Sequence, residues 1–410
     1  MSKKKIQNYN YQLTNLILYA LLLIATPFLL LQNYLQDAIG NLSASKINIF
    51  DLEIPVVLII AGIFLIFLIF KNYKSITLYR TISIIILFVM MAIGQSSTDF
   101  YFNHKFYELQ HNWHYLAYGI YSFMIYRFFS VKKKPPEKII LSVFLISLLT
   151  STFDEFIQVH ISTRIFDICD IGKDLWGSMI GLIFIFFIIE EGKIVRTGWR
   201  IRKRKIGEYF RSPISMLIFE IIFSYLLIAV SSLLTEFEHI AIALMITLGI
   251  FLVIFVVVHL SQKKMFKIIF ISLLGIIIIG QLFFFFKYNK EIIVHNSYGL
   301  TIYKGIPLVF FDVMIFENGT YRFVDKKHDF NSRDIRTISS YSTDILLIGS
   351  GSDGKGGKGF PEDHITQFIF NCAKIKPLQV IILPTPAACK KFNRLKKEGL
   401  NVVFIIHNTC

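Results

Sequence analysis

Charged residues and cysteine motifs are both scarce in this sequence. Only 17% of its 410 residues are Asp, Glu, Lys or Arg, against about 25% in a typical soluble globular protein. The formal net charge is +15, but no basic face interleaved with aromatic residues stands out in the polar C-terminal part, so nucleic-acid binding is not expected. No C-x-x-C spacing joins the cysteines, so they predict no metal site and no cofactor. The cysteines are Cys169, Cys372, Cys389 and Cys410.

Apolar residues take the place of the missing charge. They make up 54% of the chain, and the mean hydropathy is +0.58. Segments such as 16–31, 54–70 and 268–286 are long enough to cross a hydrocarbon core as helices. The sequence therefore predicts a multi-pass α-helical membrane bundle of about nine helices, surrounded by membrane lipids and followed by a small soluble α/β domain. The predicted helices lie near 13–31, 54–70, 81–96, 113–129, 139–153, 174–190, 213–234, 240–260 and 266–286.

Basic residues lie in alternate connections between the predicted helices. They follow the second, fourth, sixth and eighth helices, within 71–80, 127–138, 193–211 and 263–267. The other connections are acidic or mixed, within 37–53, 99–108, 154–174 and 236–238. Because Lys and Arg favour cytoplasmic loops, this pattern predicts a cytoplasmic N-terminus. No small-x-small cleavage site follows the first apolar run, so the first helix is expected to stay uncleaved. An odd number of helices then places the C-terminal domain outside the cytoplasm, and one helix more or fewer would reverse that placement.

The C-terminal part has the pattern of a soluble α/β domain from about residue 297. Pro307–Phe316 and Thr320–Val324 are predicted to be strands joined at an Asn-Gly turn. Further strands are expected at Ile345–Ile348, Gln379–Leu383 and Val402–Ile406, with a helix near 362–373. A second helix is expected after Leu383, with Thr385 as N-cap, Pro386 in the first position and Gly399 just past the end.

An unusual number of polar residues lies between the fifth and sixth predicted helices. Glu155 and Gln158 are three residues apart and would share a helix face. Arg164 falls in the connection, and Asp170 and Asp174 come at the start of the next helix, where acidic groups are favoured. Because ionisable groups are costly at membrane depth, they are usually paired or line a polar cavity. A site at the outer interface and a set of solvated interfacial residues are both compatible with this pattern.

The neighbouring helices add partners for this polar segment. His114 and Tyr118 are four residues apart in the fourth predicted helix and could face it. Gly177 and Gly181 form a G-x-x-x-G pattern, which allows close helix packing in lipid.

The order and spacing of these residues resemble the VanZ-like family of membrane proteins over about residues 81–190. H-x-x-x-Y in one helix is followed by E-x-x-Q, an Arg, an Asp and G-x-x-x-G. The family commonly has Asn where this chain has Asp174, which adds a negative charge. The resemblance implies a role in the cell envelope, linked to resistance to the glycopeptide teicoplanin. The positions carried over are His114, Tyr118, Glu155, Gln158, Arg164, Asp170, Gly177 and Gly181.

A glycine-rich segment after the strand Ile345–Ile348 resembles two nucleotide-binding patterns incompletely. Gly349, Gly351 and Gly354 fit G-x-G-x-x-G, but no helix opens at once. Gly349 to Lys355 fits G-x-x-x-x-G-K, but Gly356 replaces the Ser or Thr that would hold Mg²⁺. A surface loop is the favoured interpretation, with backbone amides and Lys355 that could hold an anion.

The C-terminal part also resembles the small α/β Mth-type domain. The residues concerned are DILLIGSG and the run from Thr385 to Cys410, which contains T-x-x-A-x-x-x-x-N-x-L-x-x-E-G. The domain occurs in archaeal proteins of unknown function, in adipogenesis-associated Mth-domain proteins and in a mitochondrial complex I assembly factor. The resemblance implies a compact domain of sheets and a helix, without an established active site. Cys389 falls early in its helix, but no base is placed near it, so no catalytic residue is assigned.

Three functions are weighed for a chain divided into 1–80, 81–190, 191–290 and 291–410. The leading hypothesis is a VanZ-like envelope protein whose C-terminal domain is a non-catalytic binding or scaffold module with an unknown partner. The second is an enzyme acting on a lipid-linked or cell-wall precursor, with Glu155 as general base and Arg164 as anion clamp. The third is a lipid transporter or flippase, for which no internal repeat is found. The sequence leaves enzymatic activity open and favours its absence.

Overall fold

The chain forms two compact units in a computed structural model. One unit comprises 1–98, 104–231 and 240–262, and the other comprises 99–103, 232–239 and 263–410. The structure describes residues 3–26, 38, 41–42, 45–49, 52–72, 76–98, 109–160, 166–197, 201–290, 292–330, 338, 343–359, 367–371 and 376–409.

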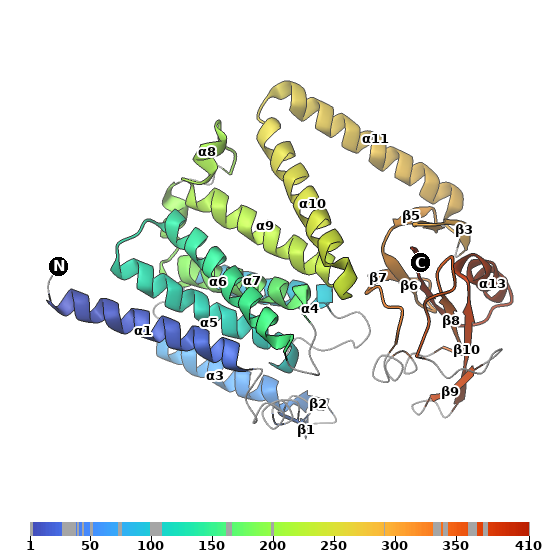
Figure 1. The fold of residues 1–410 in the computed structure, drawn as a ribbon, viewed down its shortest axis with the longest axis horizontal. Coiled ribbons are helices and arrows are strands. Elements are labelled where there is room, and N and C mark those ends of the chain that lie inside the picture. The colour runs from blue at the N-terminus through green and yellow to red at the C-terminus, as the bar shows by residue number, and fades with distance from the viewer. Residues whose placement is uncertain are drawn as a thin grey trace. The chain divides into compact units, whose positions relative to one another are not determined.

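A helix is present at each of the nine places where an apolar segment predicts one (Figure 1). Short elements lie between them: strands β1 (Lys46–Ile49) and β2 (Leu52–Pro55), and helices η4 (Lys193–Thr197), α8 (Ile206–Tyr209) and η5 (Phe237–His239). The helix α7 continues as the π-helix η3 (Phe184–Ile189). The nine helices are α1 (Lys3–Ala25), α3 (Val56–Asn72), α4 (Leu78–Thr98), α5 (Leu109–Val131), α6 (Pro136–Gln158), α7 (Ile168–Ile183), α9 (Pro213–Ser231), α10 (Ile240–Leu260) and α11 (Lys264–Tyr288).

Six helices in the described part of the chain are long and apolar enough to cross a membrane. They are α4, α6, α7 with η3, α9, η5 with α10, and α11. Among the described residues, the apolar part of α1 is Gln12–Ala25, and α3 has 17 residues. The helix α5 carries Asn112, His114 and four tyrosines, which lower its hydropathy. The apolar pattern therefore predicted where the helices are, and six of them meet the length and hydropathy expected of a membrane span.

The centre of the first unit is α7, which packs against α5, α6 and α9. Its residues from Leu175 to Ile183 are all buried, including Gly177 and Gly181. An added Cβ at Gly177 would lie 2.8 Å from the His114 carbonyl oxygen, and one at Gly181 would lie 2.7 Å from the Gly119 oxygen. These two glycines therefore let α7 approach the backbone of α5 closely.

Replacing Gly181 with Ala is expected to lower the free energy of unfolding of this bundle by about 1–3 kcal/mol, because the new methyl group meets backbone rather than a mobile side chain. Gly249→Ala is the matched control, since no atom lies within 4 Å of its added Cβ. Denaturant titration in detergent micelles measures both variants. Equal stability of the two would contradict the close α5–α7 packing.

The second unit contains a six-stranded sheet with the order β7-β6-β11-β8-β10-β9. The strands β11, β8 and β10 run parallel, and the outer pairs are antiparallel. Every residue of the central strands β8 and β11 is buried, as expected where both faces of a parallel sheet are covered. The strands are β6 (Asp312–Ile315), β7 (Tyr321–Val324), β8 (Ile345–Gly349), β9 (Gln367–Asn371), β10 (Lys376–Leu383) and β11 (Val402–Ile406).

One face of this sheet packs against α13 (Thr385–Lys397), which links β10 to β11. Ala388, Phe392 and Leu395 from α13 form a cluster with Leu347 and Phe404 from the sheet. Alternate residues of the same strands belong to a second cluster that includes Phe330 and Ile338.

A three-stranded antiparallel sheet completes the second unit. It consists of β3 (Ile293–Ser297), β4 (Leu300–Tyr303) and β5 (Ile306–Val309). The side chain of Gln281 in α11 donates to the Gly305 carbonyl at 2.8 Å, and an added Cβ at Gly305 would lie 2.4 Å from the Phe284 oxygen. The last turns of α11 are therefore fastened to the β4–β5 turn.

Three details of the sequence prediction for this domain are wrong. The segment 307–316 is two strands in different sheets, because Phe310 adopts a positive φ of 67° and breaks the extended chain. Residues 367–371 form the strand β9 rather than part of a helix, with an antiparallel pairing to β10. Pro384 occupies the N-cap position of α13 in place of Thr385, whose hydroxyl donates to the His407 carbonyl. The Asn-Gly turn between β6 and β7 is present, with Gly319 at φ 74°.

Candidate functional site

Three helices bring a histidine, a serine and an aspartate together in the first unit. The imidazole of His114 in α5 lies with Nδ1 2.8 Å from Asp174 Oδ1 in α7. The hydroxyl of Ser151 in α6 donates to the other oxygen of Asp174 at 2.6 Å. Asp174 is 2% exposed, so its carboxylate depends on these two partners in place of water. We call these three residues, together with the nearby acidic residues Glu155 and Asp170, the polar cluster.

A second buried carboxylate, that of Glu155, lies near the end of α6. It accepts a hydrogen bond from Gln158 Nε2 at 3.0 Å, and its other oxygen accepts from the Asp167 backbone N–H at 2.9 Å. Asp167 in turn caps α7 by accepting from the Cys169 N–H at 2.7 Å. Glu155 therefore holds the start of α7 in place relative to the end of α6.

Asp170 lies between the histidine and a lysine at the start of α7. Lys173 Nζ is 2.6 Å from Asp170 Oδ1, and His114 Nε2 is 3.9 Å from the same oxygen. The second imidazole nitrogen is thus close to a carboxylate but beyond hydrogen-bond distance. This part of the bundle therefore combines the cation of Lys173, the carboxylates of Asp170 and Asp174, and the His114 imidazole, whose Nδ1 contacts Asp174.

Two buried polar atoms next to these residues have no hydrogen-bond partner within the part of the chain that the structure describes. They are the Tyr118 hydroxyl and Asp154 Oδ1. Tyr118 is 3% exposed and lies one helical turn after His114 on α5. A buried hydroxyl or carboxyl oxygen without a partner costs free energy unless a ligand, ion or water meets it. Arg164, which the sequence adds to this site, lies outside the described residues.

Several polar residues of the bundle escape the sequence interpretation. Ser151 was missed, although it is four residues before Glu155 and so shares its helix face. The sequence pattern predicts no role for Lys173 or Asp167. Glu220 is the single acidic residue in the apolar helix α9, and its Oε2 is buried without a hydrogen-bond partner among the described residues. A lone carboxyl in an apolar helix was the signal that could have identified it.

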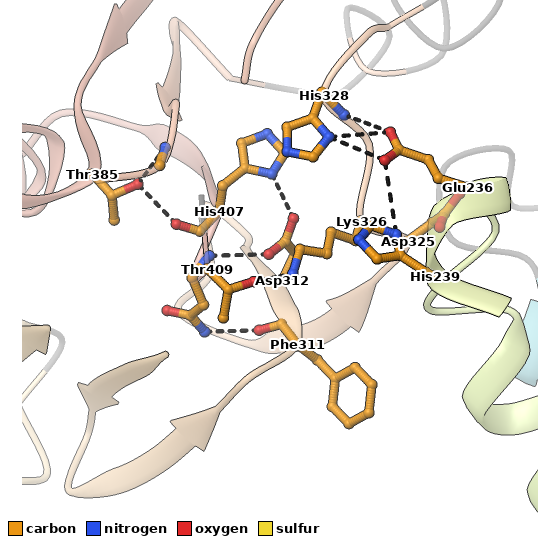
Figure 2. Close-up of polar contacts among 12 residues, drawn as sticks. Glu236, His239, Phe311, Asp312, Asp325, Lys326, His328, Thr385, His407 and Thr409 are labelled. Carbon is orange, nitrogen blue, oxygen red and sulfur yellow. Dashed lines mark hydrogen bonds and ion pairs between the residues drawn. The ribbon is translucent and has the colours of Figure 1, made fainter. Parts of the chain in front are cut away.

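The second unit contains its own buried polar group, around the end of β11. The side chains of Asp312 and His407 are fully buried, with Asp312 Oδ2 2.5 Å from His407 Nδ1 (Figure 2). The other oxygen of Asp312 accepts from the Asn408 backbone N–H at 3.0 Å. His407 stacks on His328 with ring centroids 6.1 Å apart. This pair could not be predicted from the sequence, because its residues are 95 positions apart.

The glycine-rich loop folds over this histidine. An added Cβ at Gly356 would lie 2.8 Å from the His407 ring, so glycine is needed there for close approach. Gly351 N–H donates to the Thr385 hydroxyl at 2.8 Å, and Gly356 N–H donates to the Ser350 carbonyl at 2.9 Å. Lys355 is exposed, with Nζ 3.6 Å from Asp353. Two of the loop amides therefore bond within the protein, and anion binding by Gly349, Gly351, Gly354 and Lys355 stays a prediction.

Cys389 lies in the second turn of α13, facing the sheet. It is 4% exposed and belongs to the apolar cluster beneath α13. Burial raises the pKa of the Cys389 thiol to about 12, so the thiol is protonated at neutral pH. A nucleophilic cysteine needs the opposite shift, which makes Cys389 a packing residue.

Comparisons with known proteins do not place the chain in a family. No family model matches it, and no curated protein matches it. Among solved structures, a chain titled "MT938" is 20% identical, with a TM-score of 0.24, over 30% of this chain and 100% of that chain. At that TM-score, the likeness carries no argument about fold or function.

Proposed function

We propose that the chain is an integral membrane protein of the cell envelope, similar to the VanZ-like class, and that its polar cluster binds an envelope ligand. Six long apolar helices support the membrane location. In the apolar stretch of α11, which belongs to the second unit, no side chain is buried. Ile279 and Phe286, for example, are 69% and 73% exposed. Apolar surface of this extent needs an apolar environment.

The proposed topology puts the basic connections in the cytoplasm. The segment 193–211 before α9 and the segment 261–267, which runs from the end of α10 into the first turn of α11, are rich in Lys and Arg, whereas the connection 232–239 carries Glu236 and Glu238. If α9, α10 and α11 each cross the membrane, the domain that follows α11 lies outside the cytoplasm. This argument uses only the last three helices, so it does not depend on how many helices precede them.

The observation that carries the proposed binding function is the His114–Asp174–Ser151 contact across three helices. Asp174 fixes Nδ1 of the imidazole, so that Nε2 is held in one direction. Lys173 adds a nearby cation, and Tyr118 adds a hydroxyl that makes no hydrogen bond to the described residues. Donors of this kind suit a phosphate or carboxylate group on a lipid-linked or cell-wall precursor.

Glycopeptide susceptibility of cells that express the protein tests this function. We expect the wild-type chain to lower susceptibility to a teicoplanin-type antibiotic severalfold, and His114→Ala and Glu155→Ala to abolish that effect. The matched control is Glu208→Gln, which changes an exposed carboxylate in α8. Equal protein levels in the membrane fraction must accompany the comparison. Unchanged susceptibility with the wild-type protein would contradict the resistance role.

Catalysis on a lipid-linked precursor is a second candidate, favoured by the fixed imidazole. A histidine held by a carboxylate through one nitrogen is the arrangement of a general base, whereas both Glu155 oxygens accept hydrogen bonds from the protein. His114 is therefore a better candidate base than Glu155. Turnover of a labelled lipid precursor, lost in His114→Gln, would support an enzyme, and lipid scrambling in liposomes without turnover would support a flippase.

For the C-terminal domain we propose a non-catalytic binding or scaffold role.

A further inference from the structure

Four potential metal ligands from two distant segments meet in the second unit. The connection 232–239, between α9 and α10 in the sequence, supplies Glu236, Glu238 and His239. The segment after β7 supplies His328, which is 92 residues away from Glu236. Figure 2 shows the side chains of Glu236, His239 and His328 turned toward one another. Both segments belong to the same compact unit, so this meeting is part of its fold.

The donor atoms of this group lie close together. One ligand atom each from Glu236, Glu238 and His328 falls within 4.8 Å of the other two. His328 Nδ1 is 3.1 Å from Glu236 Oε2, and His239 Nδ1 is 3.8 Å from the same oxygen. Ligand atoms in a tetrahedral site with bonds of about 2.1 Å are about 3.4 Å apart. The two printed distances to Glu236 Oε2, 3.1 Å and 3.8 Å, lie on either side of that value.

An unsatisfied nitrogen points to an occupant. His239 Nδ1 is buried and makes no hydrogen bond within the described residues, although it faces Glu236. The other nitrogen of His239 is 3.9 Å from Glu238 Oε1. Both carboxylates face these imidazoles, since Glu236 contacts His239 and His328 and Glu238 contacts His239. An ion at this point would satisfy the nitrogen and neutralise the carboxylates together.

We propose that Glu236, Glu238, His239 and His328 bind one divalent transition-metal ion of the zinc class. Mixed imidazole and carboxylate donors suit Zn²⁺ and similar borderline ions, whereas Ca²⁺ and Mg²⁺ require oxygen ligands throughout. Glu238 is 71% exposed along its side chain, so the ion can enter from solvent. Because the ligands come from both segments, the bound ion fastens the 232–239 connection to the chain that follows β7.

The arrangement around the site gives that fastening a rigid base. Thr235 Oγ1 donates to Asp325 Oδ2 at 2.8 Å. Thr235 directly precedes Glu236, and Asp325 is three residues before His328. Lys326 N–H donates to the Leu233 carbonyl at 3.2 Å. His328 also stacks on the fully buried His407, which limits rotation of its ring. The two segments are thus already aligned by contacts that do not involve the proposed ion.

Metal titration of the purified full-length protein in detergent, prepared without a histidine tag, tests the proposal. After chelator treatment, we expect one equivalent of Zn²⁺ to bind, and Co²⁺ to give the visible absorption of a low-symmetry site. Glu236→Gln and His328→Gln should each weaken binding by about 100-fold or more, since changes even beyond the direct ligands cost 10–100-fold. The controls are Glu398→Gln and His295→Ala, at exposed positions of the same unit.

The outcomes separate a metal site from a plain ion pair. Stoichiometric binding that both ligand variants lose, and both controls keep, would support the proposal. Absence of Zn²⁺ and Co²⁺ binding by the wild-type protein would overturn it and leave His328 and Glu236 as an ion pair only. Binding that survives in both ligand variants would overturn the assignment of residues. The wild-type titration needs no substitution, so it can overturn the proposal even if a variant fails to fold.

Discussion

Asp174→Ala is expected to lower the free energy of unfolding of the helix bundle by about 3 kcal/mol and to abolish any function of the polar cluster. The substitution leaves the Ser151 hydroxyl and the His114 imidazole facing a small apolar side chain in a buried place. Removing one member of a buried pair costs about 3–5 kcal/mol, because its partner keeps its desolvation penalty. Denaturant titration in micelles, with susceptibility measured in parallel, checks the result.

Ser151→Ala is the informative companion to that variant. A single interhelical hydrogen bond in a membrane contributes about 0.6 kcal/mol on average, so we expect a loss several times smaller than for Asp174→Ala. Asp174 would then act through its charge and its position between two helices more than through one hydrogen bond. If the two variants are equally stable, the carboxylate is solvated and the polar cluster is not buried as described.

Asp312→Ala is expected to destabilise the second unit by about 3 kcal/mol or more, out of a typical 5–15 kcal/mol for a folded domain. Both carboxylate oxygens of Asp312 accept hydrogen bonds, one from His407 Nδ1 and one from the Asn408 backbone. The variant leaves both donors unsatisfied at positions that exclude water. Limited proteolysis of the full-length protein should show the C-terminal part cleaved at a markedly lower denaturant concentration.

The control for this prediction is Asp353→Ala in the glycine-rich loop. Asp353 is 65% exposed along its side chain and contacts only Lys355 Nζ, at 3.6 Å, in the described salt bridges. Exposed ion pairs contribute about 0–1 kcal/mol. A proteolysis profile for Asp312→Ala that matches Asp353→Ala would show that the Asp312–His407 pair does not support the domain.

The positions of the helices could be predicted from the sequence, because each apolar run is long and bounded by charge. Four strands of the C-terminal part, β7, β8, β10 and β11, were also predicted, and β8 and β11 are short continuous apolar runs, whereas β3 and β4 were not predicted. Phe310 could not be foreseen as a break, because a positive φ in an aromatic residue is set by its surroundings and not by its own preference. The strand β9 was missed for a similar reason, since its pairing with β10 is a tertiary contact.

The polar cluster was predicted in part. The spacing between His114 and Tyr118, and between Asp170 and Asp174, placed these residues on helix faces, but which face meets which depends on the packing of α5, α6 and α7. Ser151 carries no distinguishing sequence signal, because serine is common in membrane helices. The group formed by Glu236, Glu238 and His328 could not be predicted from the sequence, because its two segments are far apart in the chain and share no recognisable ligand spacing.

The packing of the first unit depends most directly on the contact between His114 and Asp174. A double-mutant cycle with His114→Ala, Asp174→Ala and the double variant, measured as the free energy of unfolding in micelles, isolates the energy of their interaction. We expect a coupling of about 2 kcal/mol, with the double variant losing much less stability than the sum of the single variants. A coupling below about 0.5 kcal/mol, the usual range for residues that do not touch, would contradict it.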